Sequence, residues 1–514
     1  MSDSIVKNLS FGKEASDKVF IGIEKLSKAV GSTLGASGRC VLLEDNSGNP
    51  VITKDGVTVA DSIVLLDPVE NMGAKLLKEA ARKTVREAGD GTTTATVLAH
   101  AILKETYKES KLNSRQIKEG IERATDLVVE YLESIKVPVT GDMIDHVATI
   151  STNNDPVLGK LVADAFRSVG ETGVVMMETS DQADCSLDVV EGVQYNKGLV
   201  NTHFITNQER KVAELDNPLV LLLESPIDSI RQIQPALEYV IKNNRQLLIV
   251  GDLEPAVISA LAMNKLKGNI KINVVSAPTY GISKKEILDD LSMLTGATII
   301  NEDLGDDLDM FQHEYFGNCI KSITSHEDTI LHTGETTDEV NNVIEEIKKE
   351  LLKNNNAPTT IKLETRLARL SAKIAVVKVG ANSSIELKEK ADRIEDAICA
   401  TKAAIKEGIV PGGGIALLDA SYNIETSSIG EEILLRSIRA PFNVILENAG
   451  IEDISAEVLA KVGFGINVIT GKTVNMIEHG IIDPLLVTKS ALRNAVSVAT
   501  TILSTNCVIN NLRA

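Results

Sequence analysis

The sequence contains no tryptophan, and aromatic residues make up only 3% of its 514 residues. Hydrophobic residues nevertheless account for 43% of the chain, so its cores must consist mainly of alanine, valine, isoleucine and leucine. Because aromatic side chains are enriched in strands, their shortage favours a helix-rich globular protein over a β-sandwich.

Basic residues are outnumbered by acidic ones. The chain has 53 lysines and arginines against 72 aspartates and glutamates, which gives a formal net charge of -19 at pH 7. Nucleic acids and anionic membranes require a basic surface, so neither is expected as a partner. The sequence also lacks an apolar run of the roughly 18–20 residues that span a membrane. The N-terminal residues, with Asp3 and Glu14, resemble neither a signal peptide nor a transit peptide, and we predict a cytoplasmic location.

Cysteine and histidine are few and scattered. The chain has five cysteines and seven histidines, without a C-x-x-C pair or an H-E-x-x-H motif. This spacing predicts reduced, packed thiols and argues against a zinc site. The cysteines are Cys40, Cys185, Cys319, Cys399 and Cys507.

The length predicts about three domains, at the usual ~150 residues each. Apolar residues keep helical spacing towards both ends of the chain, whereas residues 174–250 contain short β-branched runs between polar loops. The predicted fold class is therefore multidomain α/β and all-α, with helical outer segments and a mixed insertion. Two helices are expected within the insertion, at about 228–242 and 253–267.

Three acidic and glycine-rich stretches together resemble one split phosphate site. Glycines let backbone N–H groups approach an anion, threonine hydroxyls add donors, and aspartates supply the oxygen ligands that Mg²⁺ prefers. The stretches are Thr53-Lys54-Asp55-Gly56, Gly89-Asp90-Gly91-Thr92-Thr93-Thr94, and Glu395-Asp396 followed by Gly412-Gly413-Gly414.

Each stretch also has a simpler interpretation. The Gly-Asp-Gly segment is expected to open a helix at Thr92, and Asp90 or Thr92 could serve only as its cap. Residues 51–67 are expected to form short strands around a turn at Asp55, so that Asp55 has no role beyond the turn. Asp396 alone is typical of a solvated acid on a helix.

Residues 465–473 resemble a P-loop, but the resemblance fails in detail. Five residues separate Gly465 and Gly471 instead of four, and an apolar strand does not lead directly into the segment. A P-loop ATPase or nucleotide kinase is therefore rejected.

Across essentially its whole length, the chain resembles the GroEL-type group I chaperonins. The resemblance is carried by many motifs in the family's order. They are Thr33-Leu34-Gly35, Ile52 to Val57, Glu70 to Ala74, Ala88 to Leu98, Leu187 to Gly192, Leu294 to Gly296, Glu395 to Ala397, Gly412 to Gly414 and Gly480 to Pro484.

The resemblance implies a chaperonin fold with a helical equatorial ATP-binding domain, a small intermediate hinge domain and an inserted α/β apical domain. It implies an ATPase that binds non-native polypeptides and promotes their folding inside a homo-oligomeric ring of seven subunits, single or double. ATP and Mg²⁺ are the implied cofactors, K⁺ is a further candidate, and a co-chaperonin is a candidate partner. The implied boundaries are 1–135 and 407–514 for the equatorial domain, 136–190 and 374–406 for the intermediate domain, and 191–373 for the apical domain.

The family's functional residues carry over by motif match. Asp55 and Asp396 match the catalytic acids that orient and polarise the attacking water, and Asp90 matches the Mg²⁺ ligand. Further nucleotide contacts are implied for Thr33, Leu34, Gly35, Lys54, Gly91, Thr92, Thr93, Thr94, Gly413, Asn467 and Asp483.

An exposed apolar strip of the apical domain binds clients and the co-chaperonin in this family. His203, Gln234 and Ala262 replace larger apolar groups there, which predicts weaker or narrower client binding. The spacing of neighbouring apolar residues fits core packing equally well. The matching positions are Leu199, His203, Phe204, Gln234, Leu237, Ile258, Ala262 and Met263.

The hinges depart from the family pattern. Ala372 and Lys373 stand in place of the usual glycines at the second hinge, whereas Gly192 remains at the first. Because glycine has the widest backbone freedom, a smaller or differently pivoted apical swing is expected. An alternative therefore stays open, a divergent ATP-binding holdase or assembly scaffold without productive encapsulation.

Overall fold

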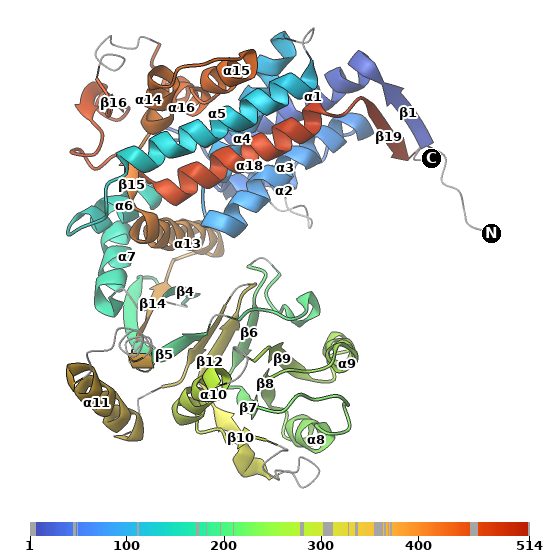
Figure 1. Cartoon of the computed structure of the whole chain (residues 1–514), viewed down its shortest axis with the longest axis vertical. Coiled ribbons are helices and arrows are strands. Elements are labelled where there is room, and N and C mark those ends of the chain that lie inside the picture. Colours follow the sequence, from blue (N-terminus) through green and yellow to red (C-terminus); the bar gives the residue numbers. More distant parts are fainter. Residues whose placement is uncertain are drawn as a thin grey trace. The chain divides into compact units, whose positions relative to one another are not determined.

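The structure is a computed structural model in which the chain forms two compact units. The first comprises Met1–Asp164, Met177–Ser186 and Lys378–Ala514, and the second comprises Ala165–Met176 and Leu187–Val377. Figure 1 labels the helices and strands. The structure describes residues 7–511 except 45–47, 49, 110–112, 171–173, 181, 196, 209, 278–281, 302–311, 327, 335–337, 354–362, 364–365, 368–369, 371–372 and 453–460.

The first unit is mainly helical, and α7 continues from it into the second unit. Its helices are α1 (Gly12–Gly31), α2 (Gly56–Ser62), α3 (Pro68–Ala88), α4 (Thr92–Lys108), α5 (Ser114–Ile135), α6 (Met143–Ser151), α7 (Pro156–Val169), α13 (Ser384–Glu407), α14 (Ile415–Asn423), α15 (Ile429–Ser437), α16 (Ala440–Ala449) and α18 (Leu485–Leu503).

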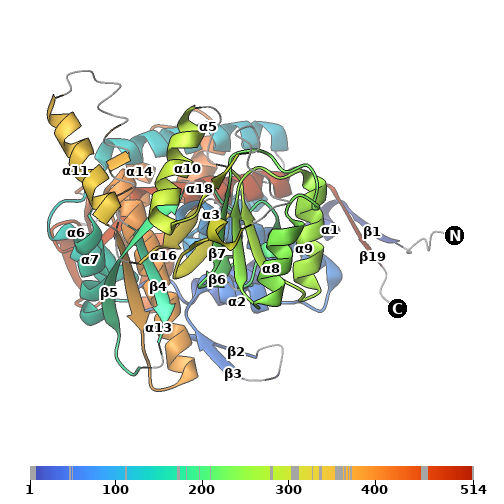
Figure 2. The same ribbon diagram turned by 90° about the horizontal axis from the view of Figure 1, so that it is seen from below.

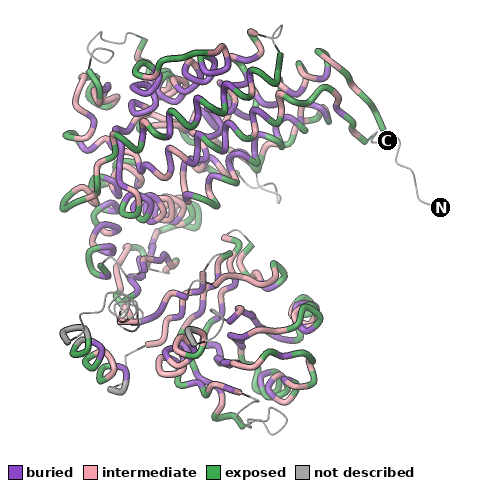
Figure 3. Tube along the Cα trace, in the orientation of Figure 1, coloured by how far each residue is buried: buried purple, intermediate pink, exposed green. Residues whose placement is uncertain are grey.

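The core of this unit lies among α1, α3, α4, α5, α15 and α18, and Figure 3 shows their buried faces. Leu26, Leu77, Leu98 and Ile102 are completely buried there, and the core contains aliphatic side chains and alanines, as the composition predicts. The helices predicted from apolar spacing near residues 13–30 and from Thr92 onward are confirmed as α1 and α4.

Short antiparallel strand pairs complete the first unit. One pair joins the two ends of the chain, with Lys7 opposite Asn511. The β2–β3 hairpin projects from the helices of this unit (Figure 2). The pairs are β1 (Lys7–Phe11) with β19 (Cys507–Asn511), β2 (Val41–Glu44) with β3 (Pro50–Thr53), β15 (Ile409–Pro411) with β18 (Ile482–Pro484), and β16 (Phe464–Asn467) with β17 (Lys472–Asn475).

The second unit contains a mainly parallel sheet with the order β10-β7-β8-β9, and β11 pairs with β7 in the antiparallel sense. Every residue of β7 is buried, which suits a central strand. The elements around this sheet are β7 (Leu219–Leu223), β8 (Gln246–Val250), β9 (Lys271–Val275), β10 (Ile299–Ile300), β11 (Gly317–Asn318), α8 (Gln234–Lys242), α9 (Pro255–Leu266), α10 (Ile282–Thr295) and α11 (Asp338–Lys353).

A second sheet has the strand order β4-β14-β5-β13-β12-β6. Together the two sheets and their helices confirm the mixed insertion between helical outer segments. The strands are β4 (Val174–Thr179), β5 (Ser186–Tyr195), β6 (Ala213–Asp216), β12 (Lys321–Thr324), β13 (Thr329–His332) and β14 (Lys373–Val379). In the part of the chain that the structure describes, no helix is long and apolar enough to cross a membrane.

Two predicted elements differ from the structure. The strands expected over residues 51–67 end at Thr53, and α2 follows, because the Asp55 side chain accepts hydrogen bonds from the first turn of that helix. The helix expected from residue 228 begins only at Gln234, because the Gln232 side chain accepts hydrogen bonds from the Asp228 and Ser229 N–H groups and holds a turn there.

Gly192 lies inside β5, opposite His332 of β13. A β-carbon at this position would lie 2.2 Å from the Ile374 side chain and 2.5 Å from the Leu331 carbonyl oxygen. Glycine is therefore required here for close packing of the sheet. Of the two predicted second-hinge positions, Lys373 begins β14 and Ala372 lies outside the described residues.

The contact between α1 and α3 gives a test of the packing. A β-carbon on Gly22 would lie 1.9 Å from the Glu70 carbonyl oxygen, which belongs to the backbone of α3 and cannot move aside alone. We expect Gly22→Ala to lower the free energy of unfolding by about 1–3 kcal/mol. The matched control is Gly31→Ala in the same helix, where the nearest atom is 3.5 Å away. Thermal unfolding of both variants measures the difference, and equal melting temperatures would contradict the packing.

Candidate nucleotide site and client-binding groove

The first two predicted phosphate stretches meet where α2 and α4 begin. A β-carbon on Gly56 would lie 2.4 Å from the Thr93 hydroxyl oxygen and 2.8 Å from the Thr92 hydroxyl oxygen. A side chain at residue 56 would therefore displace these two hydroxyl groups. Both N-termini place the positive ends of their helix dipoles in this region.

The first turn of α4 begins without a side-chain cap. Gly89 and Gly91 have φ angles of 73° and 91°, and Gly91 occupies the N-cap position. The Asp90 carboxylate accepts a hydrogen bond from the Gly91 N–H rather than from the first turn of α4. The interpretation of Asp90 or Thr92 as an ordinary helix cap is therefore wrong. N–H groups at such a helix start are suited to an anion.

Asp55 is the N-cap of α2. Its carboxylate accepts hydrogen bonds from the Val57 N–H at 3.0 Å, the Thr58 N–H at 2.8 Å and the Thr58 hydroxyl at 2.6 Å. These bonds fix the orientation of the carboxylate beside the start of α4. A carboxylate has about four acceptor positions, so capping does not use all of them.

Asp396 lies on α13, within electrostatic range of Asp90 and Asp55. Burial, reinforced by the negative charges of those two carboxylates, raises the pKa of Asp396 well above 3.8. Burial and the charge of Asp55 also raise the pKa of Asp90, although its hydrogen bond from Gly91 opposes the increase. The structure therefore brings together the three acids that the sequence singled out, and a bound cation would relieve their repulsion.

The site also fits a magnesium ion held mainly by a nucleotide. Among the described residues, no three or more His, Cys, Asp or Glu side chains form a cluster that could hold a metal ion. Mg²⁺ commonly uses only one or two protein carboxylates, with phosphates and water as its other ligands. Asp90, next to the open start of α4, suits such a role.

Gly413 and Gly414 lie beside Asp483, and the sequence predicts base or ribose contacts for Gly413 and Asp483. The N–H groups of the two glycines donate to the Asp483 carboxylate, and burial together with the charge of Asp90 raises the pKa of Asp483 to about 7. Asn467 is the last residue of β16, and its side-chain oxygen accepts hydrogen bonds from the Ile469 and Thr470 N–H groups in the turn that follows. Its amide NH₂ group keeps donors for another acceptor. Residues 465–473 thus form a hairpin, which confirms the rejection of a P-loop.

The remaining predicted nucleotide residues surround the same region. The Thr33 hydroxyl oxygen lies 3.5 Å from that of Thr93. The Lys54 ammonium donates to the Gly35 carbonyl oxygen at 3.3 Å. Gly35 has a φ angle of 83°, which favours glycine, and a β-carbon there would lie 3.1 Å from Ile445.

Two asparagines at this site were missed by the sequence reasoning. Asn448 donates to the carbonyl oxygens of Gly31 and Leu34, both at 2.9 Å, and so holds the Thr33–Gly35 loop. Asn153 accepts from Lys54 at 2.7 Å. Each asparagine is separated from its partners by about 100 residues or more, so local sequence could not predict these contacts. The Asn153-Asn154 pair, which is typical of a turn, was the one local signal in the sequence.

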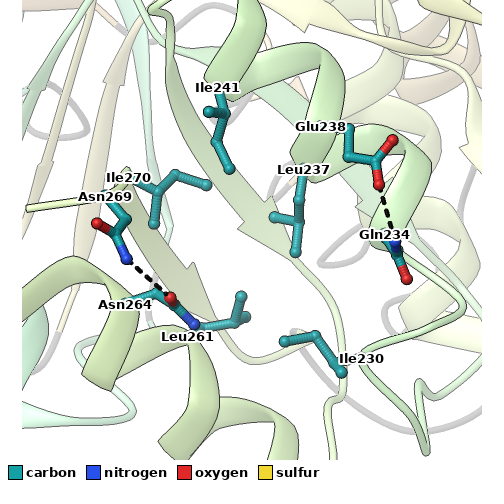
Figure 4. A pocket seen from close by; sticks show the side chains of 9 residues that line it. All are labelled: Ile230, Gln234, Leu237, Glu238, Ile241, Leu261, Asn264, Asn269 and Ile270. Carbon is teal, nitrogen blue, oxygen red and sulfur yellow. Dashed lines mark hydrogen bonds between the residues drawn. The ribbon is translucent and has the colours of Figure 1, made fainter. Parts of the chain in front are cut away.

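A separate groove lies between α8 and α9 in the second unit. It contains a pocket of about 230 Å³. Figure 4 shows apolar side chains of this pocket between two polar pairs, Gln234 with Glu238 and Asn264 with Asn269. Gln234 donates to Glu238 at 2.7 Å, and Asn269 donates to Asn264 at 3.2 Å. The lining residues are Ile230, Gln234, Leu237, Glu238, Ile241, Leu261, Asn264, Asn269 and Ile270.

The predicted client strip is only partly exposed. His203, Gln234 and Met263 are exposed, and Leu199, Leu237 and Ile258 are half-buried. Phe204 and Ala262 are buried at 0% and 1% exposure, because they pack in the core beneath α8 and α9. The expectation that these two lie on an exposed strip is therefore wrong. Ile230, Ile241 and Ile270, which were not predicted as client contacts, line the pocket instead.

The raised pKa of Asp396 predicts a pH-dependent effect on stability. Its charged form is disfavoured in the folded state, so the folded state loses stability as the pH rises from about 3.8 through the raised value. We expect Asp396→Asn to raise the melting temperature of the nucleotide-free protein at pH 8, with little difference near pH 3.5. Thermal unfolding across this range measures it, with the exposed Asp142→Asn as control. A stability difference that is independent of pH would contradict the electrostatic cause.

The comparisons with known proteins agree with this architecture. This chain is similar in structure to the chaperonin gp146 from the bacteriophage EL 2 (Pseudomonas aeruginosa), which was solved in two crystal forms in the presence of ATP-BeFx. Crystal form II has a TM-score of 0.71 and 22% identity, with all of both chains covered. Crystal form I has a TM-score of 0.65 and 22% identity, covering 98% of this chain and 99% of the other. Residues 26–513 match the TCP-1/cpn60 chaperonin family, and the chain therefore belongs to that family.

Proposed function

We propose that the protein is an ATP-dependent chaperone that binds non-native polypeptides and promotes their folding inside a ring cavity. Membership of the chaperonin family supports a chaperone role. The proposal that the protein uses ATP is supported by the positions of Asp55, Asp90 and Asp396, which lie near the uncapped start of α4. Glycines and threonine hydroxyls surround these acids, and this combination of groups suits the binding of a nucleoside triphosphate.

The phosphates would bind at the start of α4, to the backbone N–H groups and hydroxyls of Thr92, Thr93 and Thr94. Thr33 and Lys54 would contact them from the other side. Asp483, with Gly413, would contact the ribose, and Asn467 the base. Asp90 would hold Mg²⁺, which supplies charge neutralisation on the phosphates when bound, and K⁺ remains a further candidate.

Hydrolysis would depend on the two remaining acids. Asp55 is held rigidly as the cap of α2, so its carboxylate can orient a water molecule without reorganising. Asp396 has a raised pKa, which is typical of a group that accepts a proton during a reaction. Because Asp396 lies on α13, any movement of that helix would bring it towards the phosphates or away from them.

Replacement of Asp396 by alanine tests this role. We expect Asp396→Ala to lower kcat for ATP hydrolysis by on the order of 10²-fold or more, with nucleotide binding retained. Phosphate release gives the rate, and calorimetry with ADP gives the affinity. ATP-driven refolding of a denatured model enzyme should fail in the same variant, with and without a generic co-chaperonin.

The same experiment separates the chaperone from the holdase alternative. The burial of Phe204 and Ala262 favours that alternative, because it leaves a smaller apolar surface for clients. Wild-type protein that captures the denatured enzyme without ATP-driven recovery would establish a holdase. Wild-type protein that neither binds nor hydrolyses ATP would overturn the proposed nucleotide site. A ring of seven subunits, single or double, stays a prediction.

The groove between α8 and α9 is the proposed client site. Leu237 and Ile241 offer apolar surface, whereas Gln234 places an amide at the rim. We expect Ile241→Ser to weaken capture of a denatured client and Gln234→Leu to strengthen it, each by severalfold, because apolar burial drives the interaction. Co-sedimentation with a labelled denatured enzyme measures capture. Exposed Lys242→Ser, on the same helix, is the control, and capture unchanged in Gln234→Leu would contradict the proposed site.

A further inference from the structure

The ammonium group of Lys54 is held between two distant segments of the first unit. It donates to the Gly35 carbonyl oxygen at 3.3 Å and to the Asn153 side-chain oxygen at 2.7 Å. A lysine ammonium has three N–H donors. The two acceptors therefore leave one donor for a phosphate oxygen while the other two fix the position of the group.

Asn153 lies in a turn between α6 and α7 that is itself well fixed. Asn153 and Asn154 have φ angles of 60° and 61°, in the left-handed region that asparagine tolerates better than most residues. The Thr152 hydroxyl is buried and donates to the Ala148 carbonyl oxygen at 2.9 Å, and the Asn154 N–H donates to the Thr149 carbonyl oxygen at 2.8 Å. The side-chain oxygen that meets Lys54 is thus presented from an ordered backbone.

Lys54 needs such a partner more than an exposed lysine does. Partial burial lowers the pKa of Lys54, and the charge of Arg393 lowers it further, although Cys40 and Glu389 oppose this. A flexible four-carbon stem does not by itself hold an ammonium in one place. A fixed amide oxygen supplies both a favourable contact for the charged form and a defined direction.

We propose that Asn153 is a positioning residue for nucleotide binding, which acts by fixing the Lys54 ammonium toward the phosphates. The turn between α6 and α7 is thereby linked to occupancy of the phosphate site, although it lies about 100 residues from Lys54. This inference rests on the proposed function, because it takes Lys54 as a phosphate contact. It adds a residue that the motif comparison did not supply.

The test measures binding of MgADP and MgATP by calorimetry, and the ATP dependence of hydrolysis. We expect Asn153→Ala to weaken nucleotide affinity by about five- to tenfold, the usual effect of losing one hydrogen bond. The ATP concentration for half-maximal hydrolysis should rise by a similar factor, with kcat at saturation within about twofold. Asn154→Ala is the matched control, because it places alanine at nearly the same φ angle, whereas the hydrogen bond to Lys54 is made by Asn153.

A double-mutant cycle shows whether Asn153 acts through Lys54. In a Lys54→Met background, Asn153→Ala should change the affinity by less than about twofold. Equal losses in both backgrounds, or an equal loss in Asn154→Ala, would overturn the proposal and indicate only a disturbed turn. Unchanged affinity in Asn153→Ala would also overturn it. Wild-type protein that binds no nucleotide would instead overturn the proposed function, so the two failures are distinct.

Discussion

The close approach of two helix N-termini is the constraint on which the rest of the site depends. Gly56 lets the start of α2 lie against the hydroxyls of Thr92 and Thr93, where a β-carbon would collide. This contact places the Asp55 cap beside the open first turn of α4, and the positive ends of both helices lie close together. The aspartates, the loop at Gly35 and the side chain of Lys54 are arranged around it.

The negative charges of the aspartates at this site are opposite in sign to the positive ends of the helix dipoles. Burial and mutual repulsion raise the pKa values of Asp90 and Asp396, so the nucleotide-free protein carries an unfavourable group of acids. A cation and an anionic phosphate would each find an attractive partner there. The site is therefore less stable without a ligand than a well-paired core would be, which is a common property of functional sites.

Local signals in the sequence were sufficient for much of the fold. Apolar spacing predicted α1, and the glycines around Asp90 predicted the start of α4. The same kind of signal failed at α2, because apolar and β-branched residues suggested strands, while the side chain of Asp55 capped a helix. At the client groove, periodicity could not show that Phe204 packs inward, since burial depends on the core beneath α8 and α9.

The sequence by itself determined the aliphatic composition of the cores, the order of helical and mixed segments, and the acids and glycines available for phosphate chemistry. Those properties follow from residue type and short-range spacing. Only the tertiary structure shows how these residues are placed: Gly56 lies against Thr93, Asp396 lies within electrostatic range of Asp90, and Asn153 is bonded to Lys54. These pairs join segments far apart in the chain, so their placement depends on how the helices pack and not on any local pattern.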